Sequence, residues 1–312
     1  MKITNLHYAL LGLICLLLLA SFLVIVKKRL LPSINDAEIA LRLHSWWVII
    51  LLVVCALAIN TFTAMLLMAL VSFLALKEFY CLIHVRHFDT TICKISYVII
   101  PLQYGLVLAS QAQAIQFFIP IGVFIFLLTY MTVQGQAQGF LNAVSGYYIG
   151  IVLTVFLLSH TIYLFNLPIE KLPAGGVALL FYLIFLTQLN DVLQYIWGKL
   201  LGRQNQLLSL KISPLISPNK TLAGLLGGVF TTTLLAVIIA PYLTPFNVMQ
   251  SICAGLIMSV GGFIGDVIMS AIKRDVGVKN AGTLIPGHGG MLDRVDSLII
   301  TAPMFYYWMI FI

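Results

Sequence analysis

The sequence predicts an all-α, polytopic integral membrane protein with about nine to ten transmembrane helices and a cytoplasm-facing polar site in its C-terminal third. Hydrophobic residues make up 61% of its 312 residues and charged residues only 9%. A soluble domain carries roughly 25% charged residues, because its surface must face water. The apolar stretches are long and continuous instead of alternating, which favours membrane helices over a β-barrel.

Ten apolar segments are expected to cross the bilayer, at about 20 residues for each crossing. Their centres fall near residues 17, 52, 70, 102, 123, 156, 180, 232, 258 and 304. The first segment, Tyr8 to Val26, is followed by its basic cluster instead of preceded by it, which argues against a cleavable signal peptide. The region between Trp46 and Ile83 fits either one long helix or a hairpin turning at Ala58–Asn60.

The positive-inside rule favours the hairpin. With a hairpin and ten spans, fifteen of the 17 basic residues lie on one side, and only Lys2 and Lys171 lie on the other. Both termini are then predicted outside the cytoplasm. The net charge of +7 follows from the same asymmetry. No basic patch interleaved with aromatic residues is present, so we expect no nucleic-acid partner.

Neither the cysteines nor a histidine pair predicts a metal site or disulfide framework. The five cysteines are scattered, lack CxxC spacing and are typical of small membrane hydrophobes; they are Cys15, Cys55, Cys81, Cys93 and Cys253. His84 and His87 lie three residues apart near a predicted membrane boundary, which is more typical of interfacial solvation than of metal binding.

The distribution of polar motifs divides the chain into two parts. Residues 1–170 are expected to form N-terminal transmembrane helices without a recognisable motif. Residues 171–312 are expected to form the catalytic region, because residues 187–296 hold two longer loops, many glycines and five of the ten acidic residues. Three polar clusters lie there.

The first cluster is the run Asn190-Asp191…Tyr195…Gly198-Lys199, at the end of the seventh span. An aspartate leaving the membrane beside an asparagine is suited to a water-filled cavity. An interfacial helix end with aromatic anchors explains the same residues equally well.

The second cluster is Ser217-Pro218-Asn219-Lys220-Thr221, followed by three glycines. Ser217, Asn219 and Thr221 are small donors, and Lys220 is a point charge suited to phosphate. If a helix starts near Thr221, its free amides and positive dipole end would add affinity for anions. An ordinary N-capped loop is the alternative.

The third cluster, between Gly265 and Ser297, is the most specific. Asp266, Ser270 and Lys273 stand at i, i+4 and i+7 on one helical face, and an intramembrane aspartate is a functional candidate by default. Asp293 and Asp296 stand one turn apart at the start of the next helix. An antiparallel return would bring Asp266 and Asp293 together, with a cation such as Mg²⁺ between their carboxylates.

The loop between those helices reads Pro286-Gly287-His288-Gly289-Gly290. Its glycines allow close approach of the backbone to a ligand. His288 either caps the turn or touches phosphate, and no second histidine is placed to share a metal with it.

These runs resemble the signature of the phosphatidate cytidylyltransferase family, also called CDP-diglyceride synthases. The matching residues are Ser270-x-x-Lys273-Arg274, Lys279, Pro286 to Gly290 and Asp293-Arg294-x-Asp296, preceded in the family's order by the first two clusters. The resemblance implies a membrane enzyme of phospholipid biosynthesis. It would join CTP and phosphatidic acid into CDP-diacylglycerol and pyrophosphate at the bacterial cytoplasmic (inner) membrane, and a homodimer is a further expectation.

The resemblance also implies roles for single residues. Asp266 and Asp293 would hold Mg²⁺, with a monovalent cation such as K⁺ beside it. The other residues expected in catalysis are Lys273, Arg274, Lys279 and Arg294. The residues expected to bind substrate are Asp191, Ser217, Asn219, Lys220, Thr221, Ser270, His288, Gly289, Gly290 and Asp296. Because the lipid phosphate itself attacks CTP, no protein nucleophile is required, and catalysis comes from positioning and charge stabilisation.

Two departures from the family pattern leave alternatives open. The family has acidic residues where this chain has Ala223 and Asn280. A divergent paralogue, acting on another lipid phosphate or binding without turnover, is therefore the nearest alternative. A transporter is less favoured, because the charges cluster at one face instead of the midplane and no inverted repeat is detected.

Overall fold

Helices form almost all of the chain, as the all-α prediction requires. The computed structural model describes residues 5–30, 36–83, 85–86, 89–167, 175–202, 208–285 and 289–312. The α-helices are α1 Asn5–Leu30, α2 Asp36–Ile59, α3 Thr61–Leu82, α4 Thr90–Leu108, α5 Ala112–Phe117, α6 Phe124–Val133, α7 Phe140–Ile151, α8 Leu158–Tyr163, α9 Gly176–Leu201, α10 Leu222–Leu243, α11 Val248–Asp275 and α12 Leu292–Phe311.

Shorter elements join some of these helices. The π-helical turns η2 (Phe118–Val123) and η3 (Val152–Leu157) connect α5 to α6 and α7 to α8, and the 3₁₀ turn η4 (Leu164–Asn166) follows α8. A small hairpin that the sequence did not indicate precedes α10. Its strands, β1 (Lys211–Ser213) and β2 (Ser217–Thr221), pair antiparallel.

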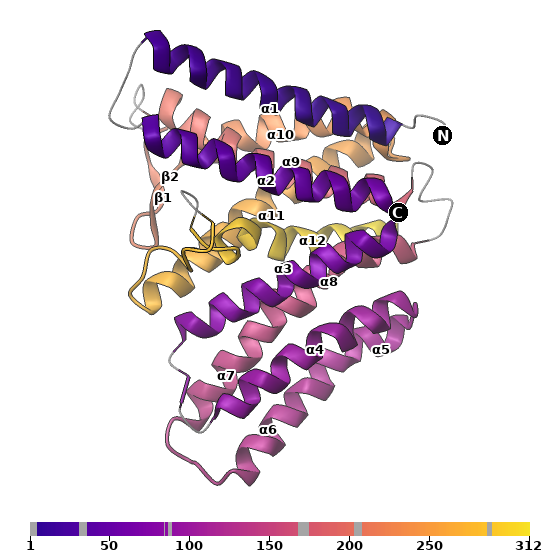
Figure 1. Cartoon of the computed structure of the whole chain (residues 1–312), viewed down its shortest axis with the longest axis vertical. Coiled ribbons are helices and arrows are strands. Elements are labelled where there is room, and N and C mark those ends of the chain that lie inside the picture. Colours follow the sequence, from indigo (N-terminus) through magenta and orange to yellow (C-terminus); the bar gives the residue numbers. More distant parts are fainter. Residues whose placement is uncertain are drawn as a thin grey trace.

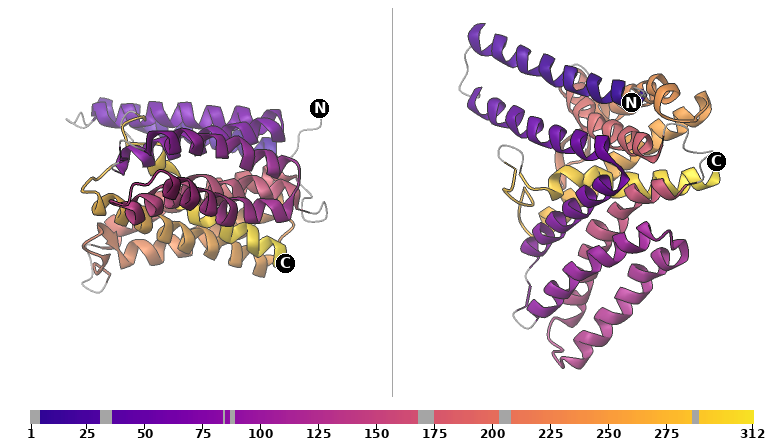
Figure 2. Two further views of the ribbon diagram at one scale, coloured as in Figure 1. Left: turned by 90° about the horizontal axis from the view of Figure 1, so that it is seen from below. Right: turned by 45° about the vertical axis from the view of Figure 1, so that its right-hand side comes forward.

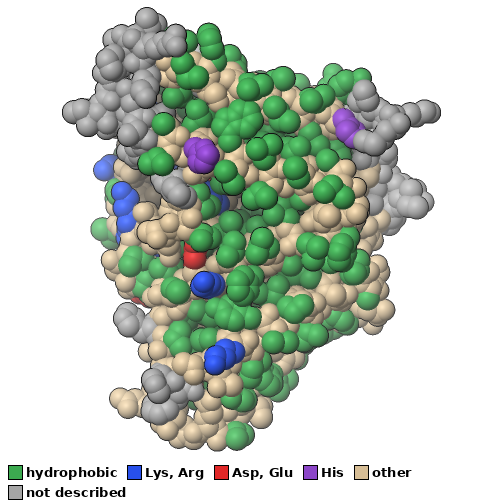
Figure 3. Space-filling model, viewed as in Figure 1, with side chains coloured by type: hydrophobic (Ala, Val, Ile, Leu, Met, Phe, Trp, Pro, Cys, Tyr) green, Lys and Arg blue, Asp and Glu red, His purple; other side chains and the backbone are tan. Residues whose placement is uncertain are grey.

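Eight stretches within the described ranges are long and apolar enough to cross a membrane. The protein is therefore a membrane protein. All ten expected segments are helical, but α2 contributes only the shorter apolar stretch Leu43–Ile59 and α12 is not among the eight. The count of ten crossings thus stays a prediction. Hydrophobic side chains cover most of the face seen in Figure 3, whereas charged side chains gather near one end of the helices.

The hairpin interpretation of residues 46–83 is confirmed. α2 ends at Ile59, and Asn60 caps α3 by accepting the amide hydrogen of Thr63 at 2.8 Å. The Thr63 hydroxyl accepts the Asn60 amide in return, at 3.2 Å. This reciprocal capping satisfies amide groups that a new helix leaves unpaired. The chain then runs back alongside α2, as Figure 1 shows.

The helices run along one general direction and fan apart across it (Figures 1 and 2). α1 and α2 lie at one end of the long axis of the molecule and α4 to α6 at the other. In the view of Figure 1, α9 and α10 lie behind α1 and α2, whereas α11 and α12 lie farther along the axis, with α3 and α8 against α12. α1 starts and α12 ends on the side opposite the β1–β2 hairpin.

Glycines and buried amides bring α9, α10 and α11 close together. A Cβ on Gly228 of α10 would lie 2.4 Å from Gln194 Cγ of α9, and one on Gly255 of α11 would lie 2.6 Å from Thr233 Cα of α10. Small residues permit such approach between membrane helices. Asn190, fully buried, donates to the Ser259 carbonyl and accepts from the Thr232 hydroxyl, both at 3.1 Å. These contacts fix the three helices whose ends carry the polar clusters.

A buried ion pair ties together two loops in the N-terminal half. Arg86 Nε lies 2.5 Å from Asp89 Oδ2, and Arg86 Nη1 donates to the Gln138 carbonyl at 2.7 Å. Tyr147 donates to the same Asp89 oxygen at 2.9 Å. The α3–α4 connection is thereby held against the segment that precedes α7.

Candidate functional site

The three polar clusters meet at one end of the helix bundle. The β1–β2 hairpin, the end of α9, the start of α10, the end of α11 and the start of α12 all lie there (Figure 1). A hollow of about 240 Å³ opens between them. It is lined by Asp191, Gln194, Tyr195, Ser217, Asn219, Lys220, Thr221, Gly224, Leu225 and Asp266. The first two clusters and the aspartate of the third therefore share one cavity.

A lysine–aspartate pair crosses this hollow. Lys220 Nζ from β2 lies 2.5 Å from Asp266 Oδ2 of α11. Lys220 also donates to Gln194 Oε1 at 3.1 Å and stands 5.5 Å from the centre of the Phe263 ring. Ser270, one turn along α11, donates to the other Asp266 oxygen at 3.3 Å. The predicted row of Asp266 and Ser270 on one helical face is confirmed.

A second lysine–aspartate pair lies beside the first. Lys273 Nζ of α11 contacts Asp293 Oδ1 of α12 at 2.6 Å, and both side chains are only 9% exposed. Asp293 Oδ2 accepts the amide hydrogens of Ala281 at 2.9 Å and Gly290 at 3.0 Å. This carboxylate therefore joins α11, α12 and both flanks of the glycine-rich loop.

Two further carboxylates lie deeper between α9, α11 and α12. Ser297 donates to both oxygens of Asp191, at 3.1 and 2.9 Å, and its amide donates to Asp296 at 2.8 Å. Asp296 lies close enough to Asp266, Asp191 and Lys273 to interact with each electrostatically. Carboxylate oxygens thus gather where α9, α11 and α12 meet, and oxygen ligands of this kind suit a bound cation.

The antiparallel return of α12 does not set Asp266 directly opposite Asp293. If Gly265 of α11 carried a Cβ atom, that atom would lie 2.4 Å from the carbonyl oxygen of Asp296 in α12. Gly265 therefore packs against Asp296, and the next residue, Asp266, lies at the same level along the two helices. Asp293 lies about one turn nearer the end of the bundle, because residues three apart are neighbours along a helix. Asp266 and Asp293 form separate ion pairs, the first with Lys220 and the second with Lys273.

The expectation of free amides at the start of α10 is wrong. Thr221 caps this helix, as predicted, by accepting the Gly224 amide at 3.2 Å. The Leu222 amide, however, donates to the Leu210 carbonyl at 2.9 Å, and the Ala223 amide donates to the Leu208 carbonyl at 3.1 Å. The turn that leads into β1 occupies these donors, so phosphate affinity here must come from side chains.

The remaining predicted residues are spread around the rim. Arg274 is exposed and donates to the Ile216 carbonyl at 3.3 Å, which holds the hairpin to α11. Lys279 is exposed, and Arg294 is partly buried, with its carbonyl accepting from Gln188. Ser217 and Asn219 line the hollow, and Gly289 and Gly290 border Asp293. His288 lies outside the described residues, as do His84 and His87.

Sequence reasoning missed one residue at this site, Glu78. It comes from α3, in the part of the chain without a recognisable motif, and is 9% exposed. Its carboxylate accepts the amide hydrogens of Met291 at 2.9 Å and Leu292 at 2.8 Å. The available signal was a single acidic residue in a predominantly apolar helix, which is a functional candidate by the same argument that selected Asp266.

The donor chemistry of the site fits a hard divalent cation. Carboxylate oxygens are the ligands that Mg²⁺ prefers, and Asp266 and Asp293 each already accommodate an ammonium cation within 2.6 Å. No three Asp, Glu, His or Cys side chains cluster as a metal cage in the part of the chain that the structure describes.

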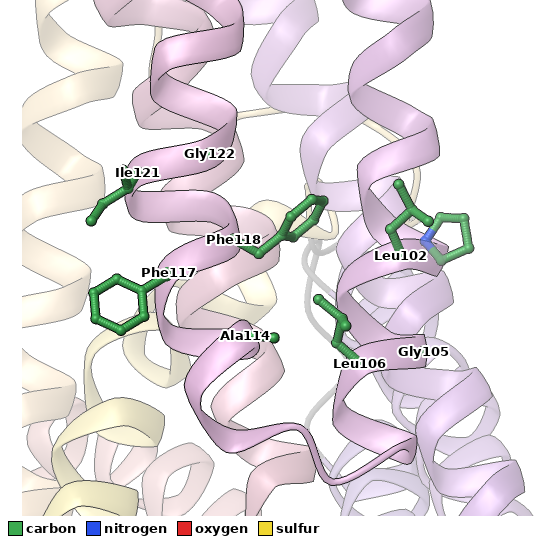
Figure 4. A pocket seen from close by; sticks show the side chains of 9 residues that line it. Leu102, Gly105, Leu106, Ala114, Phe117, Phe118, Ile121 and Gly122 are labelled. Carbon is green, nitrogen blue, oxygen red and sulfur yellow. The ribbon is translucent and has the colours of Figure 1, made fainter.

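A larger hollow of about 740 Å³ lies elsewhere, between α4 and the α5–η2 segment. Figure 4 shows Leu102 and Leu106 of α4 facing Phe118 across it. Its lining residues are apolar or glycine, and it lies away from every polar cluster. It offers no group for catalysis.

Comparison with known proteins identifies the family. The sequence profile of the cytidylyltransferase family matches residues 40–312. The chain belongs to the cytidylyltransferase family. It is therefore a nucleotidyltransferase, and the matched range includes α3 with Glu78 as well as all three polar clusters.

Individual relatives differ in the share of this chain with which they align. A protein of Escherichia coli (strain K12), named "Uncharacterized protein YnbB", is 43% identical over 296 residues, which is 95% of each chain. A phosphatidate cytidylyltransferase of Staphylococcus aureus (strain COL) is 37% identical over 131 residues, 41% of this chain and 48% of that protein. The phosphatidate cytidylyltransferase of Synechocystis sp. is 44% identical over 121 residues, 38% and 39% of the two chains. The chain thus aligns with about half of these two proteins or less.

Proposed function

We propose that the chain is a phosphatidate cytidylyltransferase, which converts CTP and phosphatidic acid into CDP-diacylglycerol and pyrophosphate. The observation that carries the proposal is the pair of lysine–aspartate contacts, Lys220–Asp266 and Lys273–Asp293, at one end of a membrane bundle. Together they supply cations for phosphates and carboxylates for a metal. Relatives named for this activity support the choice of lipid substrate.

The reaction needs no nucleophile from the protein. A phosphate oxygen of phosphatidate forms a bond to the α-phosphorus of CTP, and the bond from that phosphorus to the bridging oxygen breaks. Pyrophosphate leaves with the electron pair. Lys220, Lys273, Arg274 and Arg294 would hold the phosphates in line and neutralise the charge that develops on the leaving group.

Asp266 and Asp293 would hold Mg²⁺, with K⁺ proposed beside it. When bound, the metal supplies charge neutralisation across the phosphate oxygens and helps to orient them. Before substrate binds, each lysine neutralises the carboxylate that it contacts. A triphosphate offers these lysines a stronger anionic partner, which frees the carboxylate oxygens.

We also propose that the site faces the cytoplasm from a bacterial inner membrane, and that the chain forms a homodimer. A site at one end of the bundle can take CTP from water and phosphatidate sideways from the leaflet. The excess of basic residues predicted on that side supports this orientation.

The test uses purified protein in nanodiscs that contain phosphatidic acid, with Mg²⁺ and CTP labelled at the α-phosphorus. Label should enter the lipid fraction as CDP-diacylglycerol, whereas label at the γ-phosphorus should stay in water as pyrophosphate. Omission of phosphatidic acid is the control. Folded protein that binds CTP but transfers no label to phosphatidic acid would contradict the proposal.

A divergent paralogue is the second candidate. The Escherichia coli relative, which aligns with 95% of the chain, is not one of those named for the activity, and acidic residues of the family pattern are replaced at two positions. Ala223 is buried at the start of α10, and Asn280 is exposed beside Lys279. A large gain in rate after the joint change Ala223→Glu and Asn280→Asp would favour this candidate. So would transfer of label to a different lipid phosphate offered in the same nanodiscs.

A further inference from the structure

Glu78 is an acidic side chain from α3 that no part of the proposed reaction uses. It lies near the end of an apolar helix and is 9% exposed. Among the described residues no ion pair includes it. Both carboxylate oxygens instead accept backbone amides that lie more than 200 positions away in the chain, from Met291 and Leu292. A buried carboxylate is retained in an apolar helix at considerable cost, so a specific use is expected.

Its first effect is to cap α12. The first amides of a helix have no partner within the helix, and a negative charge is stabilised there by the helix dipole. Met291 stands at the capping position and has an apolar side chain that makes no capping hydrogen bond. Glu78 provides the missing acceptors, with Oε1 on Met291 and Oε2 on Leu292.

Its second effect is on the glycine-rich loop. A Cβ on Gly290 would lie 2.3 Å from Glu78 Oε2, and one on Gly282 would lie 2.8 Å from Oε1. Gly289 has φ of +89°, a conformation that favours glycine. The two flanks of the loop therefore close around the Glu78 carboxylate, and any larger residue at Gly282 or Gly290 would displace it.

The same backbone also holds Asp293. Gly290, which packs on Glu78, donates its amide hydrogen to Asp293 Oδ2, as does Ala281 beside Gly282. Asp293 then directs its other oxygen at Lys273. A continuous set of contacts thus leads from α3 through the loop to the carboxylate expected to hold the metal.

We propose that Glu78 is a positioning residue for cytidylyl transfer: its carboxylate fixes the two flanks of the glycine-rich loop, at Gly282 and Gly290, and the first turn of α12, and these in turn orient Asp293. The inference rests on the proposed function, but the claim that Glu78 fixes this backbone can be tested without any measurement of activity. The N-terminal helices would then take part in catalysis by holding the loop, although they contribute no group to the reaction itself.

The test compares Glu78→Gln with Lys77→Gln in nanodiscs. Glutamine keeps the length of the side chain but replaces one acceptor oxygen with an NH₂ group, which faces an amide hydrogen. Lys77 is the adjacent, exposed residue of α3 and serves as the matched control. Turnover, the KM for CTP and hydrogen exchange are measured on each, with turnover normalised to folded protein.

Glu78→Gln should lower kcat by roughly 10- to 100-fold, as for other groups that orient a metal ligand, with a smaller change in the KM for CTP. Backbone exchange should rise in peptides that cover Ala281–Gly282 and Gly289–Arg294 and stay unchanged in α9 and α10. Glu78→Asp, which keeps the charge on a shorter side chain, should recover part of kcat. Lys77→Gln should match the unmodified protein.

Two results would overturn the inference. One is unchanged exchange in the loop of Glu78→Gln. The other is exchange that rises evenly over α9 to α12, because that reports general unfolding. If the unmodified protein makes no CDP-diacylglycerol, the proposed function fails, while the exchange measurement still decides whether Glu78 fixes the loop.

Discussion

Two kinds of ion pair occur among the residues that the structure describes. The Arg86–Asp89 pair lies in the N-terminal half, and its aspartate is fully buried. The guanidinium contacts both carboxylate oxygens, at 2.5 and 3.2 Å; Tyr147 donates to Asp89, and the carbonyls of Gln136 and Gln138 accept from Arg86. The pairs Lys220–Asp266 and Lys273–Asp293 use one lysine nitrogen each, and the first is 17% and 23% exposed.

The difference indicates which pairs serve the fold and which serve the reaction. An arginine fork matches a carboxylate in a fixed geometry, and Arg86 also donates to a backbone carbonyl, as expected of a pair that stabilises the fold. A lysine is a rotatable point charge on a flexible stem. Under the proposed function, a phosphate entering the hollow would draw Lys220 away and leave Asp266 for a cation.

The largest expected effect follows from Asp293→Asn. The change removes a charge that no neighbour replaces, while an asparagine oxygen in place of Asp293 Oδ2 can still accept both loop amides. Turnover should fall by at least about 10²- to 10³-fold, the loss typical of a group that stabilises charge in the transition state. Label transfer in nanodiscs measures it, and near-normal activity would refute the metal assignment.

Lys220→Ala should have the next largest effect on the reaction. It removes the cation that lines the hollow, and it leaves Asp266 without its ammonium partner. We expect turnover to fall by about 10²-fold, with a raised KM for CTP. Lys211→Ala, an exposed residue of the same hairpin, is the control. Equal losses in both variants would show that the charge of the hairpin as a whole matters and not its contact with Asp266.

Asp89→Ala should act on stability instead. Removing one partner of a buried ion pair costs about 3 kcal/mol, near the lower end of the usual range because Arg86 is partly exposed. The melting temperature in detergent should drop, whereas turnover per folded molecule should stay within about twofold, since the pair lies outside the site. A loss of turnover at unchanged melting temperature would contradict the assignment of the Arg86–Asp89 pair to the fold.

Lys279→Ala should have the smallest effect. Its side chain is exposed, and exposed charges contribute about 1 kcal/mol or less. Turnover should fall by less than about fivefold, and the difference should vanish at high ionic strength, where exposed charges are screened. A large loss that persists in high salt would mean that Lys279 reaches the phosphates directly, as the family resemblance implies.

Much of the fold could be predicted from the sequence. Long apolar runs locate the helices because hydrocarbon leaves the backbone no other partner, and Asn60 marks a turn because its side chain can cap a helix. Asp266, Ser270 and Lys273 could be placed on one face because their spacing follows the helical repeat.

Three features of the site could not be predicted, because they depend on contacts between residues that are distant in the sequence. Nothing near Thr221 indicates that carbonyls of Leu208 and Leu210 take up the first amides of α10. The level of Asp293 relative to Asp266 depends on where the glycine-rich loop ends. Glu78 contacts that loop from α3. A single acidic residue in the sequence of this helix does not indicate that its carboxylate accepts the amides of Met291 and Leu292.

The most direct test of this account measures turnover and melting temperature together on Asp266→Asn and Asp89→Asn. Both changes remove one carboxylate charge from an ion pair at constant side-chain shape. We predict that Asp266→Asn loses turnover and keeps its melting temperature, because Lys220 retains Gln194 as a partner. Asp89→Asn should lose melting temperature and keep its turnover per folded molecule. The opposite pattern, or equal effects on both quantities in both variants, would contradict the assignment of the lysine–aspartate pairs to the reaction.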